Sequence, residues 1–170
     1  MNEKKRTEQG TAEGFLKLFN GNTGTDFKIV ELGDAPDVKC QDSNGNQLNL
    51  EITLTEDRPR DIQAILGRSD HLSVEALKEH NKRVAEGREK PRFSSLSGNV
   101  LDQVVGRIKG KLLMSYGPST ALVVRDTSGV DWEWEYVIGE IANRLKNERN
   151  PFDRGIWILN IDKTKLYQVN

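Results

Sequence analysis

The fold of this chain is decided by residues 36–55, which read Pro36-Asp37-Val38-Lys39-Cys40-Gln41-Asp42-Ser43-Asn44-Gly45-Asn46-Gln47-Leu48-Asn49-Leu50-Glu51-Ile52-Thr53-Leu54-Thr55. From position 48 onward, leucine and isoleucine alternate with polar residues, and this period of two is typical of a half-buried strand. A shorter strand is predicted at residues 38–41. The Asn44-Gly45 pair between them favours a tight hairpin turn. The stretch therefore predicts two neighbouring antiparallel strands.

Two carboxylates lie in this predicted hairpin, and a third lies on a helix upstream. Asp37 opens the first strand, Glu51 lies within the second, and Glu13 falls in the predicted helix. Converging carboxylates can hold a hard divalent cation, and such a cation can activate water for attack on a phosphodiester. Each acid also has an ordinary structural interpretation, as a helix-start acid, a turn residue or a solvated strand residue.

The segment before the hairpin predicts a short helix and one more strand. Residues 1–9 are polar and charged, which is typical of a frayed terminus. Thr11 is a plausible helix cap, and Asn20-Gly21-Asn22 is expected to end the helix. Residues 27–32 predict the first strand.

The last third of the chain predicts alternating helices and strands. Residues 97–115 carry a broad apolar helical face, and residues 138–146 belong to another helix. Residues 121–124 and 155–159 are apolar runs typical of strands buried on both faces. The glycines at 106 and 110 predict close packing of the long helix against the sheet. Together the elements predict an α/β fold, in which an antiparallel meander is followed by parallel strands and helices flank a mixed central sheet.

Residues 56–92 are dense in charge of both signs and poor in large apolar residues. They are interpreted as a charged insertion within a single domain spanning 1–170, with a helix possible at residues 73–89. A solvated insertion is favoured over an arm that contacts substrate. His71 and His80, which fall here, predict surface positions rather than a metal site.

Composition limits the function classes. The chain has 170 residues, a net charge of −1 and a single cysteine, Cys40, for which a buried thiol is expected. Near-neutral charge excludes a globally basic nucleic-acid binder, so any such partner needs a local basic face. No apolar run is long enough to span a membrane, and a cytoplasmic protein is the expectation.

The order of elements and the placement of the acids resemble the PD-(D/E)XK nuclease-like superfamily, which has the restriction-endonuclease-like fold. The resemblance covers about residues 11–165, and the Pro36-Asp37 pair matches its motif literally. It implies a Mg²⁺ or Mn²⁺ site made by Asp37, Glu51 and the carbonyl of Ile52, with Glu13 as a further ligand. It implies hydrolysis of DNA, with RNA less favoured, and a homodimer is common among such enzymes.

The chain departs from this pattern at Thr53, where the family has its lysine. That lysine orients the attacking water and neutralises developing charge. Lys39 could replace it from the strand of Asp37. Lys111 or Arg107 could replace it from the long helix, where Gln103 also lies, and the helix is slightly favoured. If none of them acts, the domain is a catalytically inactive module that binds nucleic acid or a protein.

A run of alternating acids and aromatics, Asp131-Trp132-Glu133-Trp134-Glu135-Tyr136, has two interpretations. The favoured one is a helix start, with Asp131 as the cap. The other is a patch around Trp132 and Trp134 that docks a protein partner. The second interpretation keeps open a third class of function, a small α/β interaction protein.

Overall fold

The computed structural model describes residues 1–55, 97–127 and 132–169, together with positions 79, 82 and 86, and only the backbone of residues 97–100. The predicted insertion at 56–92, apart from those three positions, lies outside the described residues. His71, His80 and Asp131 lie outside them as well.

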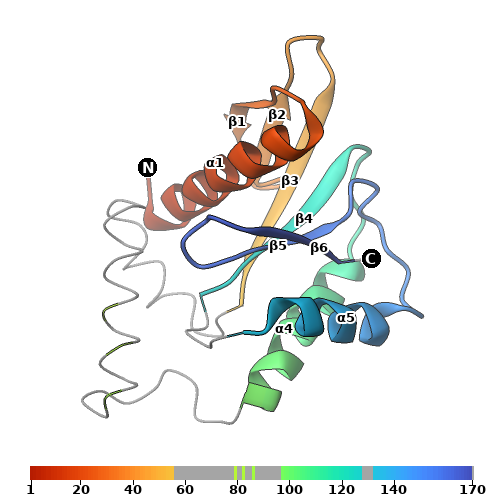
Figure 1. Cartoon of the computed structure of the whole chain (residues 1–170). Coiled ribbons are helices and arrows are strands. Elements are labelled where there is room, and N and C mark those ends of the chain that lie inside the picture. The colour runs from red at the N-terminus through yellow and green to blue at the C-terminus, as the bar shows by residue number, and fades with distance from the viewer. Residues whose placement is uncertain (56–78, 80–81, 83–85, 87–96, 128–131, 170) are drawn as a thin grey trace.

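A six-stranded mixed sheet forms the centre of the protein, and its strands lie side by side in chain order (Figure 1). The first three pair antiparallel, β3, β4 and β5 pair parallel, and the last pair is antiparallel. The strands are β1 (Lys28–Leu32), β2 (Val38–Gln41), β3 (Gln47–Leu54), β4 (Thr120–Arg125), β5 (Ile156–Leu159) and β6 (Leu166–Val169).

Helices cover both faces of this sheet (Figure 1). Helix α1 (Glu3–Thr23) packs on one face, where Phe15 and Leu16 join buried residues of β2 and β3. Helices α4 (Ser97–Leu112) and α5 (Trp134–Leu145) pack on the other, where Ile108 and Ile141 meet residues of β4 and β5. The predicted α/β class, with a mixed sheet flanked by helices, is confirmed.

Strand β4 occupies the middle of the sheet, and all six of its residues are buried. This agrees with its apolar sequence, because a parallel strand with helices on both sides has no solvated face. Strand β3 is half-exposed at its start and fully buried from Leu50 onward. The buried half of β3 is where the candidate site lies.

The start of the chain was predicted incorrectly. Residues 3–9 are helical rather than frayed, because Asn2 caps α1 by accepting a hydrogen bond from the Lys5 amide at 2.9 Å. The helix ends at Thr23, beside the predicted stop, with Gly24 in a left-handed conformation. Strand β6, which completes the sheet next to β5, was not predicted.

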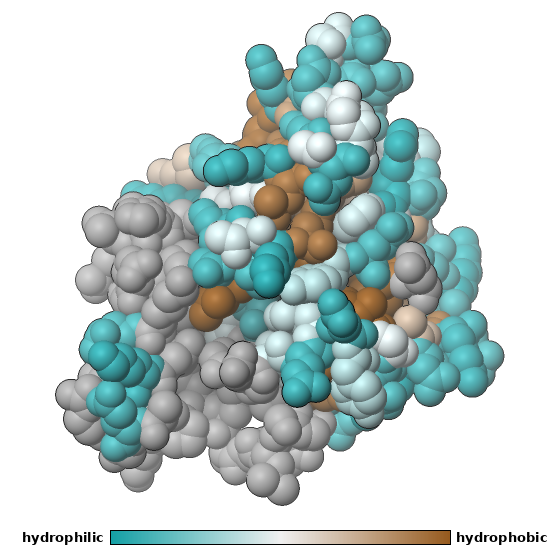
Figure 2. All heavy atoms as spheres, in the orientation of Figure 1, coloured by the Kyte–Doolittle hydropathy of each residue, from teal (hydrophilic) through white to brown (hydrophobic). Residues whose placement is uncertain are grey.

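On the coloured part of the face seen in Figure 2, most side chains are hydrophilic, and apolar side chains reach the surface in a few areas among them. Among the described residues, none of the helices is both long and apolar enough to cross a membrane.

The two glycines of α4 do not pack closely, contrary to the prediction. Gly106 and Gly110 are exposed, and a Cβ added at either would meet nothing within 4 Å. Their helical backbone therefore carries the entropic disadvantage of glycine without a packing reason.

Alanine at these positions should stabilise the protein. We expect Gly106→Ala and Gly110→Ala each to raise the free energy of unfolding, by up to about 1 kcal/mol, because alanine is the better helix former. Urea denaturation followed by circular dichroism measures this. Destabilisation by either variant would show that the helix face is packed against something.

Candidate active site

The site begins where β3 continues past β2. The two strands pair from Gln41↔Gln47 to Val38↔Leu50, and β3 then runs on through residues 51–54. Asp37, immediately before β2, accepts a hydrogen bond through Oδ2 from the backbone amide of Ile52 at 2.8 Å. The Asp37 carboxylate thus accepts the hydrogen bond that a backbone carbonyl of β2 would accept if the strand pairing continued, and it is held against β3.

A compact turn positions Asp37. The amide of Gly33 donates to the Asp37 carbonyl at 2.9 Å, and the Ala35-Pro36 peptide is cis. A Cβ on Gly33 would lie 2.8 Å from the Pro36 carbonyl oxygen, closer than side chains tolerate. From α1, the Lys5 amine donates a hydrogen bond to the Gly33 carbonyl. The turn therefore requires glycine and is attached to the helix.

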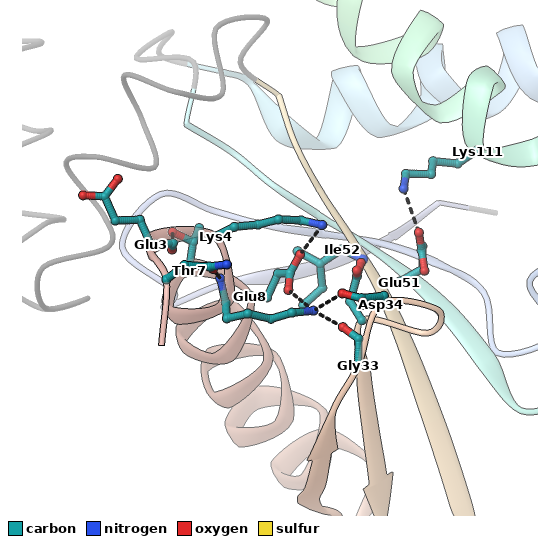
Figure 3. Close-up of polar contacts among 12 residues, drawn as sticks. Glu3, Lys4, Thr7, Glu8, Gly33, Asp34, Glu51, Ile52 and Lys111 are labelled. Atoms are coloured by element: carbon teal, nitrogen blue, oxygen red, sulfur yellow. Dashed lines mark hydrogen bonds and ion pairs between the residues drawn. The ribbon is translucent and has the colours of Figure 1, made fainter.

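Glu51 meets a lysine from the opposite helix layer. The Lys111 amine of α4 lies 2.7 Å from Glu51 Oε1 (Figure 3). The other oxygen, Oε2, is buried and has no hydrogen-bond partner among the described residues. Lys39, in contrast, pairs with the exposed Glu31 at 3.0 Å. Of the two lysines weighed from sequence, the structure brings Lys111 to the strand acid.

The helix acid that reaches this region is Glu8, not Glu13. Glu13 is exposed on α1 and accepts a hydrogen bond from Gln9. The side chain of Glu8 is 6 % exposed, and its carboxylate pairs with Lys4 at 3.4 Å and Lys5 at 3.1 Å (Figure 3).

Helical spacing in the sequence could have predicted that Glu8 is buried. It lies four residues before Ala12 and seven before Phe15, both core residues, so it shares their face of the helix. The signal was missed because the helix was expected to start at Thr11.

A pocket of about 180 Å³ lies between the start of α1, the end of β3 and α4. Its charged lining groups are three cations and one acid, which leaves a net positive wall beside the acids Asp37 and Glu51. Arg107, predicted as an alternative to Lys111, is one of these cations. The lining residues are Lys4, Thr7, Glu8, Ile52, Thr53, Leu54, Arg107 and Lys111.

Two more polar groups face no hydrogen-bond partner in the described part of the chain. They are the side-chain oxygen of Gln103, which was a predicted site residue, and the hydroxyl of Tyr116. Burial and the nearby charges of Glu51 and Asp37 raise the pKa of Tyr116 to about 12. The Tyr116 hydroxyl therefore stays neutral and can donate a hydrogen bond close to both carboxylates. No pattern in the sequence indicated this residue.

The pKa of Asp37 is raised above its ordinary value. Burial is the main cause, and the charge of Glu8 adds to it. The Ile52 amide and the positive charges of Lys111 and Lys4 act in the opposite direction and do not compensate fully. A buried carboxylate with too little positive charge around it favours an additional cation.

The oxygen donors at this place suit a hard cation such as Mg²⁺. They are the Asp37 carboxylate and Oε2 of Glu51, which no described group hydrogen-bonds. The Ile52 carbonyl adds a third, since along a strand it points to the same side as the Ile52 amide that meets Asp37. In the described ranges, no three Asp, Glu, His or Cys side chains are gathered closely enough to hold a metal ion by themselves. Mg²⁺ commonly uses only one or two carboxylates, with water and substrate phosphate as its other ligands.

Two further sequence predictions can be placed. Cys40 is buried as expected, and burial raises the pKa of its thiol to about 12. Trp132 and Trp134 lie at the start of α5, where Glu133 rather than Asp131 is the residue before the helix. Both rings are half-buried and far along the chain from the carboxylates.

Comparisons of the chain with protein-family models, with curated proteins and with solved structures gave no match.

Replacing Gly33 should disturb the turn that carries Asp37. We expect Gly33→Ala to lower the free energy of unfolding by about 1–3 kcal/mol, because the new methyl group overlaps the Pro36 carbonyl. Gly21→Ala is the matched control, since it lies in α1 with open space around it and should be stabilising. Equal thermal stability of Gly33→Ala and the unmodified protein would contradict the close approach.

Neutralising Asp37 should stabilise the metal-free protein. A carboxyl whose folded-state pKa is raised contributes most stability below its unfolded value, near 3.8, and that stability is lost as pH rises through the folded pKa. An asparagine side chain cannot ionise but can still accept a hydrogen bond from the Ile52 amide. In EDTA at pH 7, Asp37→Asn should therefore melt at a higher temperature than the unmodified protein, and the gap should close as the pH falls to about 3. A lower melting temperature at pH 7 would contradict this account.

Proposed function

We propose that this protein is a metal-dependent nuclease with a restriction-endonuclease-like arrangement, and that it hydrolyses phosphodiester bonds of DNA, with RNA less favoured. The observation that supports it best is the Glu51 carboxylate. One of its oxygens lies 2.7 Å from the Lys111 amine, and the other is buried without a partner among the described residues. A buried carboxylate oxygen without a hydrogen-bond partner costs stability. Such a cost in a central strand is expected at a functional site.

The proposed metal ligands are Asp37, Glu51 and the carbonyl of Ile52. When bound, Mg²⁺ or Mn²⁺ would stabilise charge on the phosphate and supply a water of lowered pKa. Glu8 would take the part that was expected of Glu13. The Glu8 carboxylate forms ion pairs with Lys4 and Lys5, and it contributes negative charge near Asp37.

The basic wall of the pocket gives the site its affinity for phosphate. Lys4, Arg107 and Lys111 line it and would bind a phosphodiester. The acids are connected to this lining, because Lys111 pairs with Glu51 and the Ile52 amide bonds Asp37. Lys111 would replace the family lysine that is absent at Thr53, because its amine is already at the strand acid. It would hold the attacking water and neutralise charge as the bond to phosphorus forms.

A second candidate function is binding of nucleic acid without cleavage. The observation that favours it is Thr53, which is 7 % exposed and lines the pocket where the family has its lysine. This alternative predicts that labelled DNA binds with unchanged affinity in EDTA and stays intact with Mg²⁺ or Mn²⁺.

The proposed role of Lys111 can be separated from that of Lys39. We expect Lys111→Ala to reduce the rate of metal-dependent DNA cleavage by about 10²–10³-fold, as loss of one transition-state contact does. Lys39→Ala, which breaks only an exposed pair with Glu31, should leave the rate within about twofold. A gel assay on supercoiled plasmid with Mg²⁺ and Mn²⁺ measures both. Equal rates for the two variants would remove Lys111 from the proposed chemistry.

Glu51→Gln keeps the shape of the side chain and removes its charge. It should abolish cleavage, while Glu31→Gln on β1, which also pairs with a lysine, should not. Circular dichroism of each variant verifies folding. Cleavage by Glu51→Gln at the unmodified rate would refute the nuclease proposal.

A further inference from the structure

A second pocket, which has no lining residue in common with the basic pocket, lies at the carboxyl ends of the parallel strands β4 and β5. Its volume is about 410 Å³, within the range of small-molecule sites. Asp126 directly follows β4, Asn160 and Ile161 follow β5, and Trp134 begins α5. Ligands of α/β proteins commonly bind at this end of the sheet. The remaining lining residues are Trp132, Glu135, Asp162, Thr164, Lys165 and Tyr167.

Three aromatic rings form one wall of this pocket. Trp132 and Trp134 have centroids 5.5 Å apart, and Trp134 stacks on Tyr167 at 5.7 Å with an interplanar angle of 27°. The row brings together residues from the start of α5 and from β6, so the fold and not local sequence creates it. Aromatic faces carry partial negative charge and attract cations.

Most of the charged residues that line this pocket are acidic. Asp126, Glu135 and Asp162 line the pocket together with one cation, Lys165, so the acids outnumber the cations in this lining. Behind the lining, the buried guanidinium of Arg125 interacts with the charge of Asp126. Two of the acids are held in place by neighbours. The Thr55 hydroxyl donates to Asp126 at 3.2 Å, and Asp162 accepts from Thr164 at 2.7 Å.

We propose that this pocket binds an organic cation, an alkylammonium group of the size of a lysine side-chain head. Aromatic faces and carboxylates around one cavity are the combination that recognises such groups. The excess of acids in this lining disfavours a phosphate, and the two pockets share no lining residue. The inference does not depend on nuclease activity.

The cation can come from a free amine or from a basic side chain of a partner protein. Choline serves as the probe for the first source, and 3,3-dimethylbutanol is its neutral analogue of the same shape. A capped tripeptide with a central lysine serves for the second, with norleucine as its neutral counterpart. Tryptophan fluorescence reports binding, because two of the three tryptophans, Trp132 and Trp134, line the pocket. Each titration is run at constant ionic strength.

Glu135→Gln and Glu133→Gln form a matched pair. Both acids are exposed at the start of α5, but only Glu135 lines the pocket. We expect saturable quenching by choline or the lysine peptide and none by the neutral analogues. Glu135→Gln should weaken binding by about two- to fivefold, and Glu133→Gln should leave it unchanged. The stronger of the two cations identifies the source.

Three results would overturn the proposal. One is no saturable response to either cation, and another is equal binding of the neutral analogues. The third is equal weakening by Glu133→Gln and Glu135→Gln, which would indicate only a diffuse charge effect. Because both variants change exposed residues, a failure to fold is not expected to obscure the comparison.

Discussion

The hydrogen bond from the Ile52 amide to the Asp37 carboxylate connects the fold to the site. Backbone pairing between β2 and β3 stops at Val38 and Leu50, and this side-chain bond extends the contact between the two strands to Ile52. The same bond fixes an acid beside the buried half of β3, at the residue that follows Glu51. Burial raises the pKa of that carboxylate, and a nearby negative charge on Glu8 adds to the effect. A fold selected only for stability would have an amide or an apolar residue at that position.

Charge around this bond is arranged in two layers. Acids lie against the sheet, and basic side chains from α1 and α4 surround them, with Lys111 reaching Glu51 at 2.7 Å. Lys4 and Lys5 hold Glu8 in the same way. The proposed binding of a metal ion and a phosphodiester would use both layers, because a metal ion requires carboxylates and a phosphate requires cations. The second pocket has the opposite character, with acids and aromatic rings, and this separates the two surfaces chemically.

Local patterns in the sequence were sufficient for most of the fold and for part of the site. Alternation in β3 and the Asn44-Gly45 turn predicted the hairpin, and apolar runs predicted β4 and β5. The first helix was misplaced because its first two turns are mostly charged, and the Asn2 cap and the local pairs of Lys4 and Lys5 with Glu8 that support them were not recognised. Glu13 was therefore chosen instead of Glu8. Lys111 could be named only as one of several alternatives, because a contact across 60 positions depends on how α4 crosses the sheet. Tyr116 was not predicted for the same reason. The sequence singled out Trp132 and Trp134, but not the stacking of Trp134 on Tyr167.

Calorimetric titration with Mg²⁺ or Mn²⁺ tests the central claim most directly, with the unmodified protein beside the double variant Asp37→Ala/Glu51→Ala. We expect binding by the unmodified protein and its loss in the variant, while circular dichroism shows that the sheet is intact. Equal heats from both proteins would contradict the proposed metal site. The two acids would then be structural, and the interpretation of the basic pocket as a catalytic site would fail.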